Sequence, residues 1–267
     1  MSPSLLGLRS LCGKAAVLFL AFAACGALHG AEVVASFASG ETSDACDGYP
    51  GTKGRGWLSG WQEKVLGAEF SSVRVLPESR PDATKTNYLS AKANALADGA
   101  TDVVGGALVR SYGPDSDGVN LSDPLRFEFE FRPEIVGPGS RYVIFDANRA
   151  QPSSAGNASW QIAASGGFWR IMDGAANGGK QAEINTGIPV VEGHVYSFVI
   201  QVDPLKRVWD VEIADGDRKA SFTKLNFRSE AFCLGGTLHF GFSGMDGVRD
   251  AVFQYSFGAI RIIPTRQ

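Results

Sequence analysis

Hydrophobic and polar residues alternate with a period of two through much of the chain. The clearest case is the segment 125–132, which reads Leu-Arg-Phe-Glu-Phe-Glu-Phe-Arg and is followed by Pro133. Successive side chains of a β-strand point to opposite faces, so the leucine and the phenylalanines share one face and the four charged residues share the other. A helix would scatter the phenylalanines around its surface. We therefore predict a strand with one face in the core.

The segments 194–203 and 207–213 predict a β-hairpin. A proline-containing turn separates them, and an Asp-Gly-Asp turn follows the second segment. In the second segment, alternation is expected to point Trp209, Val211 and Ile213 inward.

Shorter segments of the same kind recur between glycine- and proline-rich turns. Further strands are predicted at 33–37, 69–76, 107–112, 142–146, 159–163, 168–172, 238–243 and 252–263. The segment 87–96 fits either a short helix or an irregular strand. Many short strands without intervening helices predict an all-β, two-sheet antiparallel sandwich or barrel, and no internal repeat or low-complexity linker divides it.

The first 31 residues predict a signal peptide. Arg9 and Lys14 precede an apolar run at 15–24, and small residues follow. This run is too short to span a membrane, and no later segment approaches about 20 consecutive apolar residues. The residues 1–31 are therefore expected to direct export, and 32–267 to form a single domain.

Two processing routes fit this leader. Signal peptidase could cut near Ala27 or Ala31, which is the favoured route. Alternatively, the residues 22–25 resemble a bacterial lipobox without its usual leucine, which would leave Cys25 lipidated. Both routes predict a protein that is secreted or held in the cell envelope, in the periplasm or on the outer surface.

The mature chain keeps two cysteines, Cys46 and Cys233. In an oxidising compartment they are expected to form one disulfide, and two buried free thiols are the alternative. The net charge of −3 and the absence of a Lys/Arg cluster argue against nucleic acid or an anionic membrane as a partner.

Three stretches carry a resemblance to a known superfamily. The segment 47–61 contains a Tyr-Pro-Gly and then two Gly-Trp pairs, 196–211 contains a Tyr-x-Phe, an Asp-Pro and a Trp-x-Val, and 257–262 ends in Ile-Arg-Ile. Together they resemble concanavalin A-like or laminin-G-like jelly-roll domains in exported proteins of planctomycete and verrucomicrobial-type bacteria. The resemblance implies a fold that serves lectins, hydrolases and lyases alike, so it leaves the function open. Gly258-Ala259 departs from the acidic or asparagine pair of these domains, which puts an equivalent ion or turn contact in doubt.

The charged row Arg126, Glu128, Glu130 and Arg132 is the best candidate for chemistry. Carboxylates at positions i and i+2 of a strand lie about 6.5–7 Å apart on one face, near the separation found in glycosidases. The arginines could bind sugar hydroxyls or uronate carboxylates. The alternative is a solvated face whose charges pair with each other, and an arginine beside a glutamate weakens a general acid. Glucanases of this fold carry a third acidic residue on this strand, which this sequence lacks. The Gln-x-His motif of alginate lyases is also missing.

His239 is a second candidate. It shares the polar face of its predicted strand with Gly241 and Ser243, so it could line a groove and carry a proton. An ordinary exposed histidine is the alternative.

The aromatic candidates for sugar stacking are Trp57, Trp61 and Trp169, which lie near glycine-rich turns and are expected to be exposed. Alternatively, Trp57 and Trp61 cap the open end of the sandwich. Trp160 and Trp209 are expected in the core.

No cofactor and no metal site is predicted. The histidines and cysteines lack zinc spacing. Acid-rich turns such as 115–117 and 215–217, and the pair Asp246 and Asp250, leave calcium open, although none matches an ordered calcium loop.

Three functions fit this sequence. The favoured one is an exported glycan-binding or cell-surface module without a catalytic motif, with a polysaccharide or cell-surface glycan as its partner. The second is a polysaccharide hydrolase or lyase that uses Glu128 and Glu130 on the concave sheet. The third is a structural envelope protein.

Overall fold

The fold is built almost entirely from β-strands. The computed structural model describes residues 32–37, 48–51, 56–79, 85–96, 103–114, 118–137, 139–150, 155–229, 234–245 and 251–265. Within these ranges the helical elements are two 3-10 turns, η1 (Ala155–Asn157) and η2 (Ala176–Gly178). The predicted all-β class is therefore confirmed.

One sheet has seven strands, and each pairs antiparallel with its neighbours. Their order is β10 (Ala182–Pro189), β9 (Phe168–Asp173), β8 (Ala158–Ser165), β7 (Ser140–Asn148), β14 (Gly236–Met245), β5 (Val103–Ser111) and β2 (Gln62–Leu66).

The other sheet has nine strands and is also antiparallel. Its main path is β13 (Arg218–Asn226), β12 (Val208–Asp215), β11 (Tyr196–Asp203), β6 (Leu125–Pro133), β15 (Val252–Phe257), β4 (Lys85–Ala95) and β3 (Ala68–Ser79). In addition, β16 (Ile260–Pro264) pairs with β6, and β1 (Val33–Ala35) pairs with β16.

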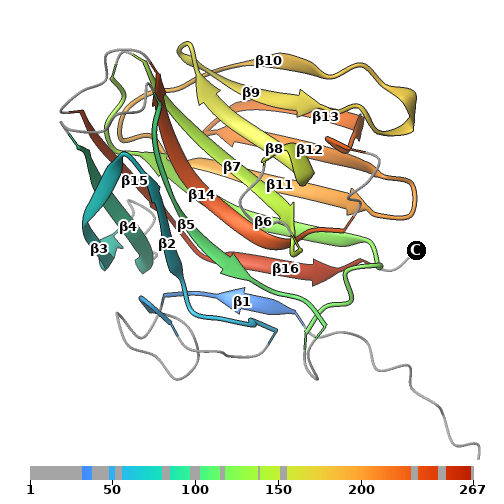
Figure 1. Cartoon of the computed structure of the whole chain (residues 1–267), viewed down its shortest axis with the longest axis horizontal. Helices are drawn as coiled ribbons and strands as arrows, with labels where there is room; N and C mark the ends of the chain where they lie inside the picture. The colour runs from blue at the N-terminus through green and yellow to red at the C-terminus, as the bar shows by residue number, and fades with distance from the viewer. Residues whose placement is uncertain are drawn as a thin grey trace, which may run out of the picture.

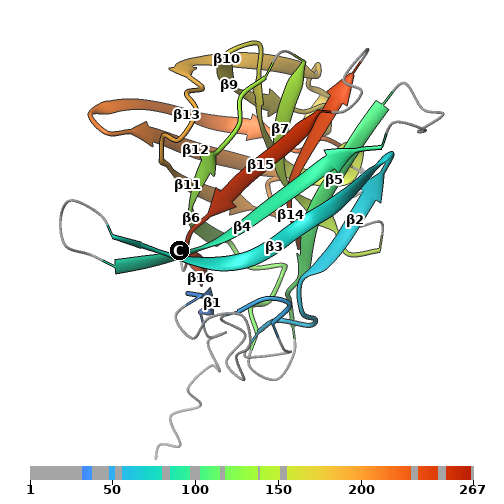
Figure 2. The same ribbon diagram turned by 90° about the vertical axis from the view of Figure 1, so that its left-hand side faces the viewer.

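The two sheets pack face to face, as the two views in Figures 1 and 2 show. The first and last strands, β1 and β16, lie side by side (Figure 1). The predicted two-sheet sandwich is confirmed.

Every strand predicted from alternation is present, with small shifts at its ends. The predicted segment 252–263 is broken into β15 and β16 at Gly258-Ala259, and the ambiguous segment 87–96 belongs to strand β4. The strands β2, β10 and β13 were not predicted from the alternation, and all three are edge strands of the two sheets. An edge strand buries little surface, so its apolar alternation is weak: all five residues of β2 are exposed.

Strand β6 supplies the centre of the core. Its residues alternate between buried and half-buried from Leu125 to Pro133, with the phenylalanines inward as predicted. Phe127 packs edge-on against Trp160, and Phe129 packs edge-on against Phe240, with ring centroids 5.5 and 5.2 Å apart. Because Trp160 and Phe240 belong to the seven-stranded sheet, these contacts join the two layers.

Trp209, Val211 and Ile213 are buried, as alternation in the second hairpin strand predicted. Trp160 is also in the core, as expected.

A buried carboxylate lies at one end of this core. Asp146 is 1% exposed and accepts hydrogen bonds from the Tyr112 hydroxyl at 2.9 Å, the Ser159 hydroxyl at 2.8 Å and the Gly236 N–H at 3.0 Å. Burial raises its pKa from 3.8 to about 6, against the opposing effect of these hydrogen bonds.

This shift predicts a pH-dependent stability. Because the folded pKa of Asp146 lies above the unfolded one, the folded state binds this proton more tightly. Its contribution to the free energy of unfolding is therefore most favourable below about pH 4 and declines toward about pH 6, by on the order of 3 kcal/mol. Urea unfolding across this interval should show wild type losing stability relative to Asp146→Asn, which has no carboxyl to titrate. Parallel pH profiles for the two proteins would contradict this assignment.

Candidate functional site

The outer face of the seven-stranded sheet is hollowed. Val109, His239, Phe145 and Gln161 form one row of cross-strand pairs on this face. All four side chains are buried, with 4–8% of their surface exposed, although they point away from the core between the sheets. On the nine-stranded sheet, the outward residues of β6 are only half-buried. The concave, recessed face is therefore the outer face of the seven-stranded sheet.

A pocket of about 510 Å³, which we call the central pocket, lies on this face over β2, β5, β14 and β7. The rings of His239 and Phe145 form part of its wall and stack with their centroids 4.1 Å apart. Its floor contains small residues, among them Gly105, Ala107 and Gly241. The lining is thus mainly apolar and roomy enough for a small ligand group.

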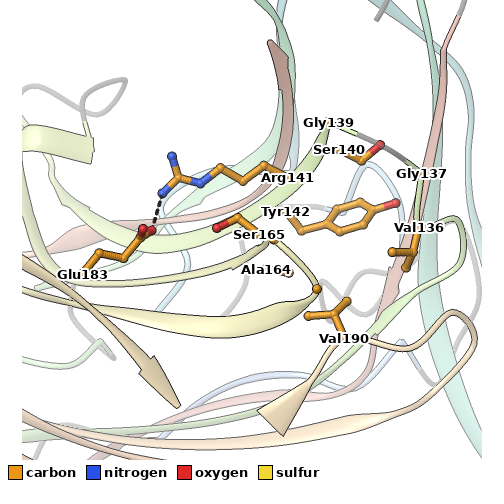
Figure 3. Close-up of a pocket in the computed structure, with 12 residues that line it drawn as sticks. Val136, Gly137, Gly139, Ser140, Arg141, Tyr142, Ala164, Ser165, Glu183 and Val190 are labelled. Atoms are coloured by element: carbon orange, nitrogen blue, oxygen red, sulfur yellow. Dashed lines mark hydrogen bonds and ion pairs between the residues drawn. The ribbon is translucent and has the colours of Figure 1, made fainter. Parts of the chain in front are cut away.

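A second pocket of about 530 Å³ lies where β7 begins, between the loop that precedes this strand and the β8–β9 turn. We call it the rim pocket, and Figure 3 shows its lining. The side chain of Arg141 extends to one side, toward Glu183, whereas Tyr142 points to the other side, toward Val136 (Figure 3). The Tyr142 hydroxyl donates a hydrogen bond to the Gln254 carbonyl at 2.9 Å, which anchors that wall to the nine-stranded sheet.

The charged side of the rim pocket is held by ion pairs. A guanidinium nitrogen of Arg141 lies 3.2 Å from Glu183, and one of Arg170 lies 3.8 Å from the same carboxylate. Arg170 also donates through Nε to the Ser165 carbonyl at 3.1 Å. This places both guanidinium groups beside the β8–β9 turn that lines the pocket.

An aromatic ring adjoins these arginines. Phe168 is 38% exposed and is the single exposed aromatic side chain in the described part of the chain. It pairs with Ser165 across the β8–β9 turn, and it shares its face of β9 with Arg170 two residues on. Phe168 was not among the predicted site residues, although it follows a Gly-Gly turn, which is the signal that had pointed to the tryptophans.

The expected exposure of the tryptophans was wrong. Trp57, Trp61 and Trp169 are 0%, 4% and 0% exposed. Trp57 donates through Nε1 to the Val34 carbonyl at 2.9 Å, and the guanidinium of Arg110 lies 4.4 Å from its ring centroid. Glycines near these rings allow the backbone to turn, but the rings themselves fold into the core. They are therefore core residues rather than surface platforms for a sugar.

The structure separates the predicted carboxylate pair from the hollow. Glu128 and Glu130 lie on the outer face of the nine-stranded sheet, and neither lines the central or the rim pocket. Glu128 contacts the guanidinium groups of Arg126 at 2.6 Å and Arg261 at 2.9 Å. The expectation that this pair lies on the concave sheet was wrong, because alternation fixes which residues share a face but not which sheet the strand joins.

The rest of the charged row is paired as well. The Tyr88 hydroxyl donates to Glu130 at 2.8 Å. Arg132 lies 2.7 Å from Glu134 and stacks over the Tyr88 ring at 5.3 Å. The row thus has the paired arrangement that was the alternative to a catalytic one.

His239 is far from these carboxylates and lies in the central pocket, so the structure does not bring the candidate catalytic residues together. Its 4% exposure also corrects the alternative of an ordinary exposed histidine. The small neighbours Gly241 and Ser243 line the same pocket, as their shared face implied.

Several expectations fall outside the described residues. These are the leader 1–31 with Cys25, the pair Cys46 and Cys233, and the acidic positions in 115–117 and 246–250. Within the described residues, no three or more metal-ligand side chains converge. In the same part of the chain, no helix is long and apolar enough to cross a bilayer.

Comparison with known proteins places the fold. The two antiparallel sheets form a jelly-roll sandwich. One similar structure comes from work on endo-acting O-glycanases that members of the human gut microbiota express to initiate mucin breakdown. It has a TM-score of 0.50 and 10% identity, covering 88% of this chain and 99% of the other. At this identity the likeness concerns the fold alone.

Two further solved structures show more distant likeness. The Klebsiella pneumoniae alginate lyase has a TM-score of 0.43 and 9% identity, covering 72% of this chain and 85% of its own. The Lotus tetragonolobus seed lectin has a TM-score of 0.40 and 10% identity, covering 75% and 94%. No protein-family model and no curated protein matches the sequence.

The burial of the tryptophans leads to a prediction about stability. Trp57→Ala should lower the free energy of unfolding by about 3–5 kcal/mol, because it removes a fully buried ring and leaves a cavity. Phe168→Ala should change it by less than about 1 kcal/mol, because that ring is partly solvated. Urea unfolding of both variants tests this contrast, and equal losses would contradict the assignment of Trp57 to the core.

Proposed function

We propose that this protein is an exported glycan-binding module that binds a saccharide at the rim pocket. The observation that carries the proposal is the exposed ring of Phe168, which lies at the β8–β9 turn that lines the pocket and shares its strand face with Arg170, while Arg141 lines the pocket itself. A pyranose ring presents an apolar C–H face and polar hydroxyl edges, so it suits an aromatic platform next to fixed donors.

The shape of the concave face supports the same function. The rim and central pockets lie at neighbouring places along β7, where Arg141 and Tyr142 line one and Val143 lines the other. A run of sugar units is long and narrow, and two adjacent pockets on one recessed face provide more than one subsite for it. The fold shared with the structure from work on mucin O-glycanases agrees with a glycan as ligand.

Binding is favoured over hydrolysis by the carboxylates available. Glycoside hydrolysis commonly uses two carboxyl groups on either side of the scissile bond. Among the described residues that line the two pockets, Glu183 is the one carboxylate, and two arginines hold it. Glu128 and Glu130, the pair expected from the sequence, lie on the other sheet in ion pairs and hydrogen bonds of their own.

Export and membership in the laminin-G-like group of bacterial envelope domains form part of the proposal. They rest on the leader at 1–31 and on the sequence resemblance described above.

Binding of the purified protein to a panel of neutral and acidic polysaccharides tests this function. Phe168→Ala should weaken binding to the best polymer by several-fold to about tenfold, because the sugar loses its stacking surface. Leu205→Ala is the matched control, since Leu205 is an 80% exposed apolar residue at the β11–β12 turn, away from both pockets. It should bind as wild type does.

Two results would overturn the proposal. One is the absence of binding to every polymer in the panel, and the other is unchanged binding by Phe168→Ala. New reducing ends or unsaturated sugars released in the same tubes would show that the protein is an enzyme rather than a binding module.

A further inference from the structure

One side of the rim pocket carries more positive than negative charge. Arg141 and Arg170 both contact Glu183. Burial lowers the pKa of Arg228, and the positive charge of the nearby Arg141 lowers it further. Arg228 comes from the segment after β13, and its backbone N–H donates to the Ala158 carbonyl at 3.2 Å. Two guanidinium groups thus contact one carboxylate, and a third lies within electrostatic range of it, in a protein whose net charge is −3. We call these three arginines the arginine cluster.

The arginine cluster has hydrogen-bond donors in reserve. Arg141 contacts Glu183 through one terminal nitrogen at 3.2 Å, and Arg170 does so through one of its own at 3.8 Å. Both side chains are partly exposed, so a ligand can reach their other terminal N–H groups. Each guanidinium carries five N–H groups in a planar fork, and Glu183 uses only a few of them. The remaining donors suit an anionic group with two or more oxygen acceptors.

Two further carboxylates are associated with the wall that Tyr142 and Val136 form. Glu192 lies on the opposite wall and accepts the Val136 N–H at 3.0 Å. The charge of Glu134 also acts on Tyr142, which forms the same wall. Glu134 is paired with Arg132 at 2.7 Å. The rim pocket therefore has a positive side next to Phe168 and an acidic side next to Tyr142.

We propose that the saccharide bound at the rim pocket is acidic, and that the arginine cluster binds its carboxylate or sulfate group while Phe168 packs on the sugar ring. This inference rests on the proposed glycan-binding function and names its ligand class. Both anions present oxygens to a guanidinium fork, so the shared chemistry is an anionic group fixed to a sugar.

The experiment compares polymers that differ only in charge. Binding is measured for polygalacturonate and for the same polymer with its carboxyl groups reduced to alcohols, and for dextran sulfate and dextran. The acidic member of at least one pair should bind at least about tenfold tighter than its neutral partner, and added salt should reduce this difference. The pair with the larger difference identifies the anion as carboxylate or sulfate.

The variants remove one charge at a time. Arg141→Gln and Arg170→Gln should each weaken binding of the acidic polymer by about tenfold, because a charge-assisted hydrogen bond is lost. Arg126→Gln is the matched control: its side chain is 35% exposed against 33% for Arg141, and it also pairs with a glutamate, but on the other sheet. It should leave binding unchanged.

Glu183→Gln distinguishes a binding role from damage to the fold. Removing this carboxylate frees Arg141 and Arg170, so affinity for the acidic polymer should rise several-fold. A misfolded variant would bind less. Unchanged or weaker binding by a Glu183→Gln protein with a wild-type unfolding transition would overturn the inference.

The failure of this inference differs from the failure of the proposed function. Equal binding of charged and neutral polymers that still depends on Phe168, with no effect of Arg141→Gln, would overturn the acidic ligand but leave glycan binding intact. No binding to any polymer, charged or neutral, would overturn both.

Discussion

The aromatic layer between the two sheets is the contact on which the remaining architecture depends. Phe127, Phe129 and Phe131 of β6 meet Trp160, Phe240 and Trp169 of the opposite sheet, with ring centroids 5.2–5.8 Å apart. Large aromatic side chains bury about 150–250 Å² each, so this layer contributes strongly to the packing of the two sheets. A slip of one residue along β6 would place its arginines and glutamates in this layer. The register of the centre of the sandwich is therefore fixed, and with it the outward position of Glu128 and Glu130.

The hollow on the other side follows from an asymmetry within β14. Leu238, Phe240 and Phe242 point into the core, whereas His239, Gly241 and Ser243 point outward. Large residues on one face and small ones on the other satisfy the core and leave space outside. At Gly241, an added Cβ would lie 2.7 Å from the Gly106 carbonyl oxygen, so the close approach of β5 and β14 also requires a residue without a side chain. Packing and the recess are consequences of the same alternation.

Most interior strands and the faces they bury could be predicted from the sequence, because a strand with one face in the core shows a strong period of two; β4 is the exception, since the segment 87–96 also fitted a short helix. The alternation does not assign a strand to one sheet or the other, and this is why Glu128 and Glu130 were expected on the concave face. The choice of aromatic residue failed for a related reason. Phe168 and Trp169 are adjacent on β9, so only one of the two rings can face the core, and composition does not decide which. The arginine cluster was also missed, because Arg141, Arg170 and Arg228 come together only in the folded chain.

Glu183 has two opposing effects on the arginine cluster. By pairing with both Arg141 and Arg170, it holds two flexible side chains near one place, which lowers the conformational entropy that a ligand would otherwise have to remove. The same carboxylate competes with an anionic ligand for those guanidinium groups. Because its side chain is 34% exposed, solvent screens both effects, and the competition remains the larger one because each guanidinium must give up this carboxylate to bind an anion. The glutamate still positions the arginines without neutralising them, since three positive groups lie within electrostatic range of one negative group.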